Sequence, residues 1–333
     1  MTNLVDPFGR KHDYLRISVT DQCNLRCLYC MPEEGMQFMD NEKLLRFNEI
    51  IEVVRAGAEM GIRKLRITGG EPLVRRNLEQ LIADLAHIPG IDDISMTTNG
   101  IFLAKKAAEL KAAGLNRVNI SLDTLDPSRF RMIARSGELS KVLEGIEAAA
   151  KVGFEPIKLN MVLLKDINDD EIGAFLRMSV DHPLHIRFIE YMPIGHADDN
   201  WKRHYQPLDR VLEVANELGL HVKPIGDILG NGPSENFQIQ DGAGTFGLIH
   251  PVSNHFCEQC NRLRLTSDGH LKPCLYWVDE LDVRPHLGSQ EAMQRLFEKA
   301  MVIKPQNHEM AAKLDNELQS HIPTERRMSQ IGG

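Results

Sequence analysis

Two consecutive segments near the amino terminus decide the fold: LRISVT at residues 15–20 and CNLRCLYC at residues 23–30. The first is a short run rich in β-branched residues, which predicts a strand. The second places Cys23, Cys27 and Cys30 in a C-x3-C-x2-C loop directly after that strand. Three thiolates from one tight loop can hold three irons of a four-iron cubane, which takes four protein ligands when complete. The fourth iron is then open to a further molecule.

Zinc is the alternative metal for this loop, because closely spaced cysteines also build zinc sites. A structural zinc site needs four ligands. No histidine occurs between Asp13 and Ala86 to complete such a site locally. The sequence therefore favours iron at these three cysteines, with zinc as the weaker hypothesis.

Beyond the loop, strand and helix patterns alternate along the chain. Strands are predicted at residues 15–20, 64–68, 94–98, 117–123, 157–164 and 185–192. Helices are predicted from their apolar spacing at residues 44–60, 78–88, 103–113, 142–152, 172–180 and 208–218. Several helices end at a glycine, such as Gly61 and Gly114, as is usual for a helix stop. Alternating strands and helices predict an α/β fold with a parallel sheet and right-handed crossovers.

A doubly wound sheet and a barrel are the two architectures of this class. No G-x-G-x-x-G follows the first strand, which disfavours a dinucleotide-binding fold. Unusual segments instead follow several different strands, and such convergence on one rim is typical of barrel enzymes. Six units would leave a barrel open on one side. We predict a partial TIM-like barrel at residues 1–195 and a C-terminal region at residues 196–333 that covers the open side.

The C-terminal region has a different pattern. Residues 196–247 are richer in polar and loop-forming residues, and we assign them no role. Residues 230–247 are predicted to form a loop or hairpin. Two further helices are predicted at residues 290–301 and 307–318.

Composition limits the classes of function. The formal net charge of −8 argues against a general nucleic-acid coat. The opening residues lack the apolar segment of a secretory signal, and no apolar run is long enough to span a membrane. We therefore expect a cytoplasmic protein with no membrane partner. In that compartment, clustered cysteines are more often metal ligands than disulfides.

A second group of three cysteines lies near the other end of the chain, at Cys257, Cys260 and Cys274. Zinc is a stronger alternative here, because His255 and His270 are close enough in sequence to supply a fourth ligand. The segment after Cys260 has arginines at alternate positions of an apolar run. On a strand such residues share one face, where two guanidinium groups suit phosphate or purine recognition.

The first cysteine loop resembles the signature of the radical S-adenosylmethionine (SAM) superfamily, in which an aromatic residue, here Tyr29, precedes the last cysteine. Residues 69–72 (GGEP) resemble the superfamily's motif for the SAM amine. Adjacent glycines such as Gly70 allow close backbone approach, and Glu71 can accept a hydrogen bond from an ammonium group. Ser121 and Met192 resemble the remaining SAM contacts. A strand-end serine and a core methionine are equally good interpretations of these two.

Three further segments resemble the molybdenum cofactor biosynthesis protein A family, the GTP 3′,8-cyclases. They are residues 257–269 (CEQCNRLRLTSDG) with Cys274, residues 190–193 (EYMP) and residues 327–333 (RMSQIGG). The resemblance spans essentially the whole chain. It implies that Cys23, Cys27 and Cys30 hold one 4Fe-4S cluster with SAM on its open iron. It also implies that Cys257, Cys260 and Cys274 hold a second cluster, whose open iron binds guanine.

The same resemblance implies the other site residues and the reaction. A SAM-derived 5′-deoxyadenosyl radical would abstract the ribose 3′-hydrogen of GTP, and C3′ would attack C8 of guanine. The tail, Gly332 and Gly333, would insert into the active site. The implied GTP contacts are Arg16, Arg66, Thr97, Lys158, Arg262, Arg264 and the backbone of Leu263.

The implied partners are GTP, an electron donor such as flavodoxin or ferredoxin, the downstream cyclic pyranopterin monophosphate synthase, and a second copy in a homodimer. Nucleic acid is not among them. Three alternatives stay open: a radical SAM enzyme with a peptide substrate, an iron–sulfur electron carrier, and a zinc-dependent binding module. The Arg-x-Arg pair and the Gly-Gly tail argue against the peptide alternative.

Overall fold

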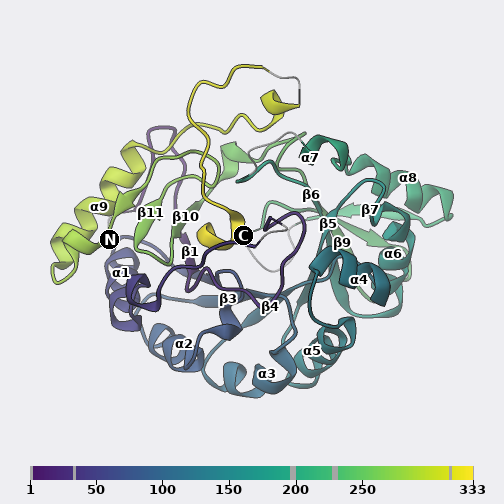
Figure 1. Ribbon diagram of the computed structural model, residues 1–333, viewed down its shortest axis with the longest axis horizontal. Helices are drawn as coiled ribbons and strands as arrows, with labels where there is room; N and C mark the ends of the chain where they lie inside the picture. The colour runs from purple at the N-terminus through teal and green to yellow at the C-terminus, as the bar shows by residue number, and fades with distance from the viewer. Residues whose placement is uncertain (1–2, 33–34, 196–199, 227–231, 315–316, 333) are drawn as a thin grey trace.

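The computed structural model describes residues 3–32, 35–195, 200–226, 232–314 and 317–332. Its strands form a curved sheet surrounded by an outer layer of helices, and the carboxyl end of the chain lies inside this ring (Figure 1). The fold is a partial TIM-like barrel, as predicted.

The six predicted strands are present and pair in parallel, in chain order. Their observed bounds are β1 Tyr14–Ser18, β2 Lys64–Thr68, β3 Asp93–Thr98, β4 Arg117–Ser121, β5 Ile157–Leu163 and β6 Leu184–Glu190. The helices that cover them are α1 Phe47–Glu59, α2 Leu78–Ala86, α3 Leu103–Ala112, α4 Pro127–Ala134, α5 Leu139–Lys151 and α6 Ile172–Asp181. In β1 the buried side chains of Leu15 and Ile17 alternate with Tyr14, Arg16 and Ser18, and they belong to the apolar core that the helices cover.

One helix of the barrel was not predicted from the sequence. Helix α4 begins after Asp126, whose carboxylate accepts a hydrogen bond from the Arg129 backbone amide at 2.6 Å. Pro127 occupies the first helical position, where its missing amide costs nothing. The residue that ends the helix, Arg135, has a positive φ of 57°.

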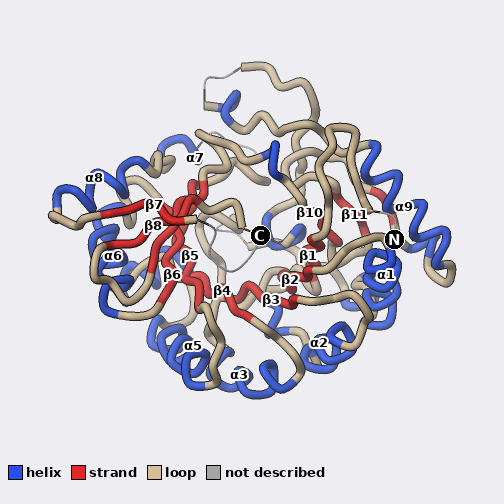
Figure 2. The backbone as a smooth tube through the Cα atoms, turned by 180° about the vertical axis from the view of Figure 1, so that it is seen from behind, coloured by secondary structure: helices blue, strands red, loops and turns tan. Residues whose placement is uncertain are grey.

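The C-terminal region extends the sheet at both edges. Strand β9 (Thr245–Ile249) pairs in parallel with β6, and β10 (Arg262–Leu265) pairs in parallel with β1. Antiparallel strands follow outward: β8 (Glu235–Ile239) and β7 (Val222–Ile225) beyond β9, and β11 (His270–Lys272) and β12 (Leu281–Asp282) beyond β10. Within the described residues the result is one sheet of twelve strands, seen from behind in Figure 2. The predicted hairpin near residues 230–247 is β8 and β9.

The remaining helices lie in the C-terminal region, at α7 Asn200–Arg203, α8 Asp209–Glu217, α9 Gln290–Val302 and α10 Met328–Ile331. The helix predicted at residues 307–318 was wrong. Among its described residues only a short 3-10 turn forms, at Ala311–Lys313. The backbone carbonyls of Asn307 and Glu309 instead accept hydrogen bonds from the Trp277 indole and the Gln319 amide, so tertiary contacts replace the helical ones.

Two apolar clusters hold these layers together. The larger lies between the sheet and the outer helices. A smaller one gathers Trp201, Tyr276 and Trp277 with Ile331 of the tail, so the end of the chain belongs to a packed core. Among the described residues, no helix combines the length and apolarity needed to cross a membrane.

Candidate active site

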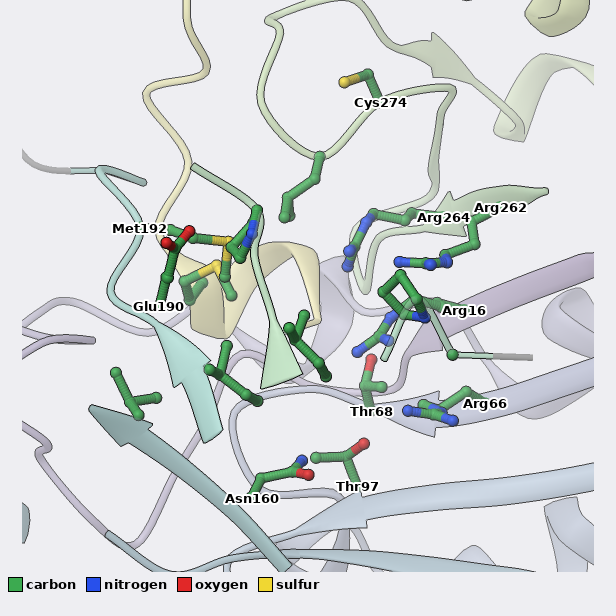
Figure 3. Close-up of a pocket in the computed structure, with 18 of the residues that line it drawn as sticks. Arg16, Arg66, Thr68, Thr97, Asn160, Glu190, Met192, Arg262, Arg264 and Cys274 are labelled. Carbon is green, nitrogen blue, oxygen red and sulfur yellow. The ribbon is translucent and has the colours of Figure 1, made fainter. Parts of the chain in front are cut away.

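A cavity of about 330 Å³ lies at the carboxyl ends of the barrel strands. All six cysteines of the chain line it. Its volume falls at the lower end of the range typical of ligand sites. Figure 3 shows two sides of the cavity, with arginine side chains on the right and Met192 and Glu190 on the left. The labelled arginines on the right are Arg16, Arg66, Arg262 and Arg264.

The first cysteine loop is held by hydrogen bonds to neighbouring segments and by its own Arg26, whose guanidinium donates to the carbonyl oxygens of Cys23 and Leu25. The backbone amides of Arg26 and Leu28 donate to carbonyls at the end of α4, at 2.9 and 3.0 Å. The Asn99 side-chain amide donates to Asn24 Oδ1 at 2.8 Å. Burial raises the pKa of the Cys30 thiol to about 12, and raises the pKa of Cys27 well above its usual value. Such thiols need bound positive charge to ionise, which a metal cluster supplies.

The glycines of the GGEP segment bring β2 against this loop. A Cβ atom at Gly70 would lie 2.4 Å from the Gln22 carbonyl oxygen, so no larger residue fits. The Gly70 amide donates to the Thr20 carbonyl oxygen at 2.8 Å. Gly70 itself lines the cavity. The glycine pair therefore packs the second strand end tightly beside the residues that lead into Cys23.

Glu71, which is predicted to contact the SAM amine, lies outside the cavity lining. Its side chain is fully buried. The carboxylate accepts hydrogen bonds from Leu73 N at 3.0 Å, Thr98 Oγ1 at 2.8 Å and Asn99 N at 2.7 Å. These bonds use both carboxylate oxygens. They tie the ends of β2 and β3 together. Burial raises the pKa of Glu71 to about 7.

The other predicted SAM contacts, Tyr29, Ser121 and Met192, all line the cavity. The Tyr29 hydroxyl donates to Asp123 Oδ2 at 2.7 Å, and the Val162 amide donates to Asp123 Oδ1 at 2.9 Å. Burial raises the pKa of Asp123 to about 6. Asp123 was not singled out from the sequence, although its position two residues after Ser121 was an available signal.

Cationic side chains form one wall of the cavity. Arg16, Arg66, Arg262 and Arg264 lie on the adjacent strands β1, β2 and β10, where Arg16 pairs in register with both Arg66 and Arg264. Arg187 on β6 also lines the cavity. It was not predicted from the sequence, where it lies two residues after His185 within a predicted strand. Burial, followed by the neighbouring guanidinium charges, lowers the pKa of Arg187 to about 9 and of Arg264 to about 10.

Several buried polar atoms of this wall have no hydrogen-bond partner among the described residues. They are Tyr14 OH, Thr97 Oγ1, Asn160 Oδ1, Arg187 Nε and Arg262 Nε. Every one of these residues lines the cavity. Buried donors and acceptors in proteins are nearly always paired, so their concentration here indicates a polar ligand. Burial alone would raise the pKa of Tyr14, but Arg66 and Arg16 outweigh it and lower that pKa.

Two predicted GTP contacts lie outside the cavity lining. Lys158 is buried on β5 in register with Asn119, one layer below Asn160. Burial, with Arg187 and Arg66 next in effect, lowers the pKa of Lys158 to about 7. The Leu263 side chain is fully buried in the apolar core, as expected for a residue predicted to contribute only its backbone.

The second cysteine group comes from three segments around β10 and β11. Cys257 begins a 3-10 turn, Cys260 precedes β10, and Cys274 follows β11. Of the two histidines that could complete a zinc site, His270 has another partner, because its Nδ1 lies 3.3 Å from Asp268 Oδ1. The His255 ring packs against that of His308 with centroids 5.2 Å apart, and its buried Nδ1 has no hydrogen-bond partner among the described residues. Neither histidine lines the cavity. Among the described residues, no three side chains of metal-binding type are placed to hold a single metal ion.

The tail enters the barrel beside this wall. Arg264 Nη1 donates to the carbonyl oxygens of Ile331, at 3.3 Å, and Gly332. Gly332 has a φ of +71°, and a Cβ atom there would lie 2.0 Å from Thr68 Oγ1. Arg326 anchors the approach through Glu280 and Asp268, at 2.7 and 2.9 Å. Gly332 is not part of the cavity lining, and Gly333 lies outside the described residues.

Sequence families divide the chain in two. The Radical SAM superfamily matches residues 17–179, and the family described as Molybdenum Cofactor Synthesis C matches residues 184–310. Among solved structures, SuiB of Streptococcus suis bound to S-adenosylmethionine superposes with a TM-score of 0.59 at 13% identity, over 87% of this chain and 68% of that one. Native anSMEcpe with bound AdoMet gives a TM-score of 0.55 at 16% identity, over 89% and 82%. These similarities establish the fold.

Relatives over the whole chain are closer in sequence. A GTP 3′,8-cyclase of Listeria monocytogenes serovar 1/2a is 57% identical over 333 residues, which is 100% of both chains. Proteins of the same name are 49% identical in Lactiplantibacillus plantarum, with 100% of both chains covered, and 47% identical in Moorella thermoacetica, with 98% of this chain and 99% of the relative covered.

Proposed function

The chain belongs to the GTP 3′,8-cyclase family of radical SAM proteins, and from this premise we propose how its residues perform the first step of molybdenum cofactor biosynthesis. The reaction joins C3′ of the ribose to C8 of the guanine within one molecule of GTP, giving (8S)-3′,8-cyclo-7,8-dihydro-GTP. The cavity supports this assignment because it brings two three-cysteine sites and a cationic wall to one space.

The cysteines are suited to two 4Fe-4S clusters, one held by Cys23, Cys27 and Cys30 and one by Cys257, Cys260 and Cys274. When bound, the first cluster and SAM together supply the 5′-deoxyadenosyl radical. The chain's part is to hold SAM: Gly70 offers its backbone, Tyr29 and Ser121 offer hydroxyls, and Met192 contributes an apolar contact. We assign Glu71 a positioning role, because its bonds to Thr98 and Asn99 fix the strand ends under this site.

The cationic wall is the observation that carries the choice of substrate. The guanidinium groups of Arg16, Arg66, Arg187, Arg262 and Arg264, together with that of Arg10, line one cavity in a chain of net negative charge. Neighbouring like charges repel, and burial lowers the pKa of Arg16 well below its usual value. A triphosphate relieves this repulsion through charge-assisted, bidentate hydrogen bonds. A peptide substrate would not need such a wall.

The same geometry orients the nucleoside. Arg262 and Arg264 lie on the strand that directly follows Cys260, so a nucleotide bound by these arginines lies beside the second cysteine site. Thr97 Oγ1 and Asn160 Oδ1 can take up ribose or base hydrogen bonds. Lys158 contributes from the layer below through its charge. Holding C3′ near both C8 and the radical source is a positioning task, which a rigid strand rim performs well.

The tail closes the cavity in this proposal. Gly332 and Gly333 follow α10, which packs into the smaller apolar core through Ile331. Arg264 is shared between the tail carbonyls and the cavity wall. Its placement links closure of the site to the residues that bind the substrate, and closure shields a radical intermediate from water.

The partners follow from the same chemistry. An electron donor such as flavodoxin or ferredoxin must supply electrons to the clusters, and a cyclic pyranopterin monophosphate synthase consumes the product. We further propose that the chain acts in the cytoplasm, where six free cysteines remain reduced, and that it forms a homodimer.

The test is an anaerobic assay of reconstituted protein with SAM, dithionite and GTP, followed by mass spectrometry. We expect GTP-dependent 5′-deoxyadenosine together with the cyclised nucleotide. If deoxyadenosine forms while GTP stays intact, the substrate assignment is wrong. If neither product forms although about eight irons are bound per chain, the radical SAM assignment itself fails.

A further inference from the structure

Lys304 is a buried ammonium group whose charge the cyclisation chemistry above does not use. It follows helix α9 and only 4% of the residue is exposed. Its Nζ donates to two backbone carbonyl oxygens, of Arg262 at 3.0 Å and of Pro273 at 2.5 Å. Among the described residues, it forms no ion pair with a carboxylate. A buried charge without a counter-charge is costly, so its retention needs an explanation.

The two carbonyls that Lys304 binds belong to the segments that carry the second cysteine group. Arg262 comes two residues after Cys260, and Pro273 directly precedes Cys274. Lys304 also lines the cavity beside these cysteines. The Lys304 ammonium is therefore placed beside the segments that carry Cys260 and Cys274, where bound thiolates would supply the negative charge that it faces.

Arg10 completes the arrangement at the third cysteine. Its Nη1 donates to the Cys257 carbonyl oxygen at 2.8 Å and to that of Gln306 at 2.6 Å, and its Nη2 donates to that of Pro305 at 2.7 Å. The carbonyls of Pro305 and Gln306 thus bind Arg10, and the adjacent Lys304 binds the segments that carry Cys260 and Cys274. Asp6 fixes the guanidinium from behind through a contact of 2.5 Å.

We propose that Lys304, supported by Arg10, is a positioning residue for the second iron–sulfur cluster, which holds its cysteine segments together and places a fixed positive charge beside the cluster. This inference rests on the proposed function, because it takes Cys257, Cys260 and Cys274 as cluster ligands. Residues that support metal ligands from behind commonly contribute ten- to one-hundred-fold to metal affinity. A nearby positive charge also stabilises the reduced form and makes the reduction potential less negative.

The test uses the full chain with Cys23, Cys27 and Cys30 replaced by alanine, so that only the second site is loaded. Lys304→Met keeps the length of the side chain and removes its charge, and Lys304→Arg keeps the charge. Lys299→Met is the matched control, because Lys299 is exposed in the last turn of α9, the helix that precedes Lys304. The measurements are iron loss to a chelator and the reduction potential followed by electron paramagnetic resonance.

We expect Lys304→Met to lose iron about ten-fold faster, with a more negative potential, and Lys304→Arg to restore most of the potential. Lys299→Met should match the parent in both. An unchanged potential in Lys304→Met would overturn the inference, even if the melting temperature of the metal-free chain falls, since that pattern indicates a purely structural lysine. A parent chain that binds no iron at this site would instead overturn the proposed function.

Discussion

The two three-cysteine sites face one cavity but are built in different ways. The first takes all three thiols from eight consecutive residues, and its cation is local, because Arg26 of the same loop donates to the Cys23 and Leu25 carbonyl oxygens. Hydrogen bonds to α4 and Asn99 hold this loop from outside. The second takes its thiols from residues 257–274 and is held by two cations from outside its own segment, Arg10 and Lys304. Arg10 reaches Cys257 across 247 residues of sequence. The ligands and the cation of the first site are thus local in sequence, whereas the cations of the second site come from distant parts of the fold.

The electrostatic settings differ as well. At the first site burial dominates and raises the pKa of Cys23 to about 11 and of Cys30 to about 12. At the second site burial also raises the pKa of Cys257 to about 11, but Lys304 and Arg262 outweigh burial at Cys260 and lower its pKa to about 7. The Cys260 thiol therefore ionises more readily than those of Cys23, Cys30 and Cys257. The comparison teaches that cations beside a cysteine can outweigh the effect of its burial.

The largest effect is expected from removing a cysteine at either site. Cys27→Ser should abolish 5′-deoxyadenosine formation, by at least about 10³-fold, because SAM is cleaved at the first cluster. Cys274→Ser should retain some SAM cleavage but yield no cyclised nucleotide. Iron content should fall by about half in each variant. If both variants lost deoxyadenosine formation equally, the prediction that the two sites differ in function would be wrong.

The second largest effect concerns the two arginines of β10. Arg264→Met should lower kcat/KM for GTP by about 100-fold, since each hydrogen bond to a charged group contributes about 1.5–3 kcal/mol and Arg264 also binds the tail. Arg262→Met should lower it by about ten-fold, mainly through KM, because among the described residues Arg264, and not Arg262, forms hydrogen bonds to the tail. Steady-state kinetics separates kcat from KM. Identical changes in kcat and KM for the two variants would contradict the prediction that Arg264 serves both the substrate and the tail.

Gly332→Ala should lower turnover by about ten-fold while both clusters stay loaded. The added Cβ would meet Thr68 Oγ1, and the φ of +71° strains any residue other than glycine. Gly288→Ala is the matched control, since Gly288 has a φ of +82° but open space around its Cβ position. Deoxyadenosine release under single-turnover conditions checks the prediction. A normal rate in Gly332→Ala would show that the tail does not close the site.

The smallest effect is expected from Asn99→Ala. This change removes the hydrogen bonds that the Asn99 amide donates to Asn24 Oδ1 and Cys23 Sγ, and the one that its Oδ1 accepts from the Ile101 amide. A neutral hydrogen bond contributes about 1 kcal/mol. The first loop should lose iron a few-fold faster to a chelator, and the second site should be unaffected. Because Lys304→Met is expected to have the opposite selectivity, the pair of variants tests whether the two sites are stabilised independently.

Most of the barrel could be predicted from the sequence because its signals are local. The strand at Lys64–Thr68 has the predicted bounds, and the other barrel strands differ by no more than two residues at either end. Helix α4 was missed because it is only eight residues long, which is too short for a clear apolar period. The predicted helix at 307–318 was wrong because its carbonyls are used by distant side chains, which no local pattern reveals.

The site could be predicted in part. The cysteines, the arginines of β1, β2 and β10, and Tyr29 all line the cavity, because strand ends of a parallel barrel meet at one rim. Glu71 does not, because its carboxylate caps a turn within the chain instead. Arg187 and Lys304 were missed because an isolated charged residue in a sequence gives no sign of what it will face after folding. Asp123 could have been found from its position two residues after Ser121.

Both edges of the six-stranded barrel are completed by strands from the last third of the chain. Until residue 265 has been synthesised, β1 exposes an edge that is later covered by β10, and such edges are prone to pair with other molecules. The amino-terminal residues must likewise wait for residues 305 and 306 before Arg10 finds its partners. A message truncated before residue 265 would therefore yield an aggregation-prone product, and the second site cannot be completed before Cys274 has been synthesised.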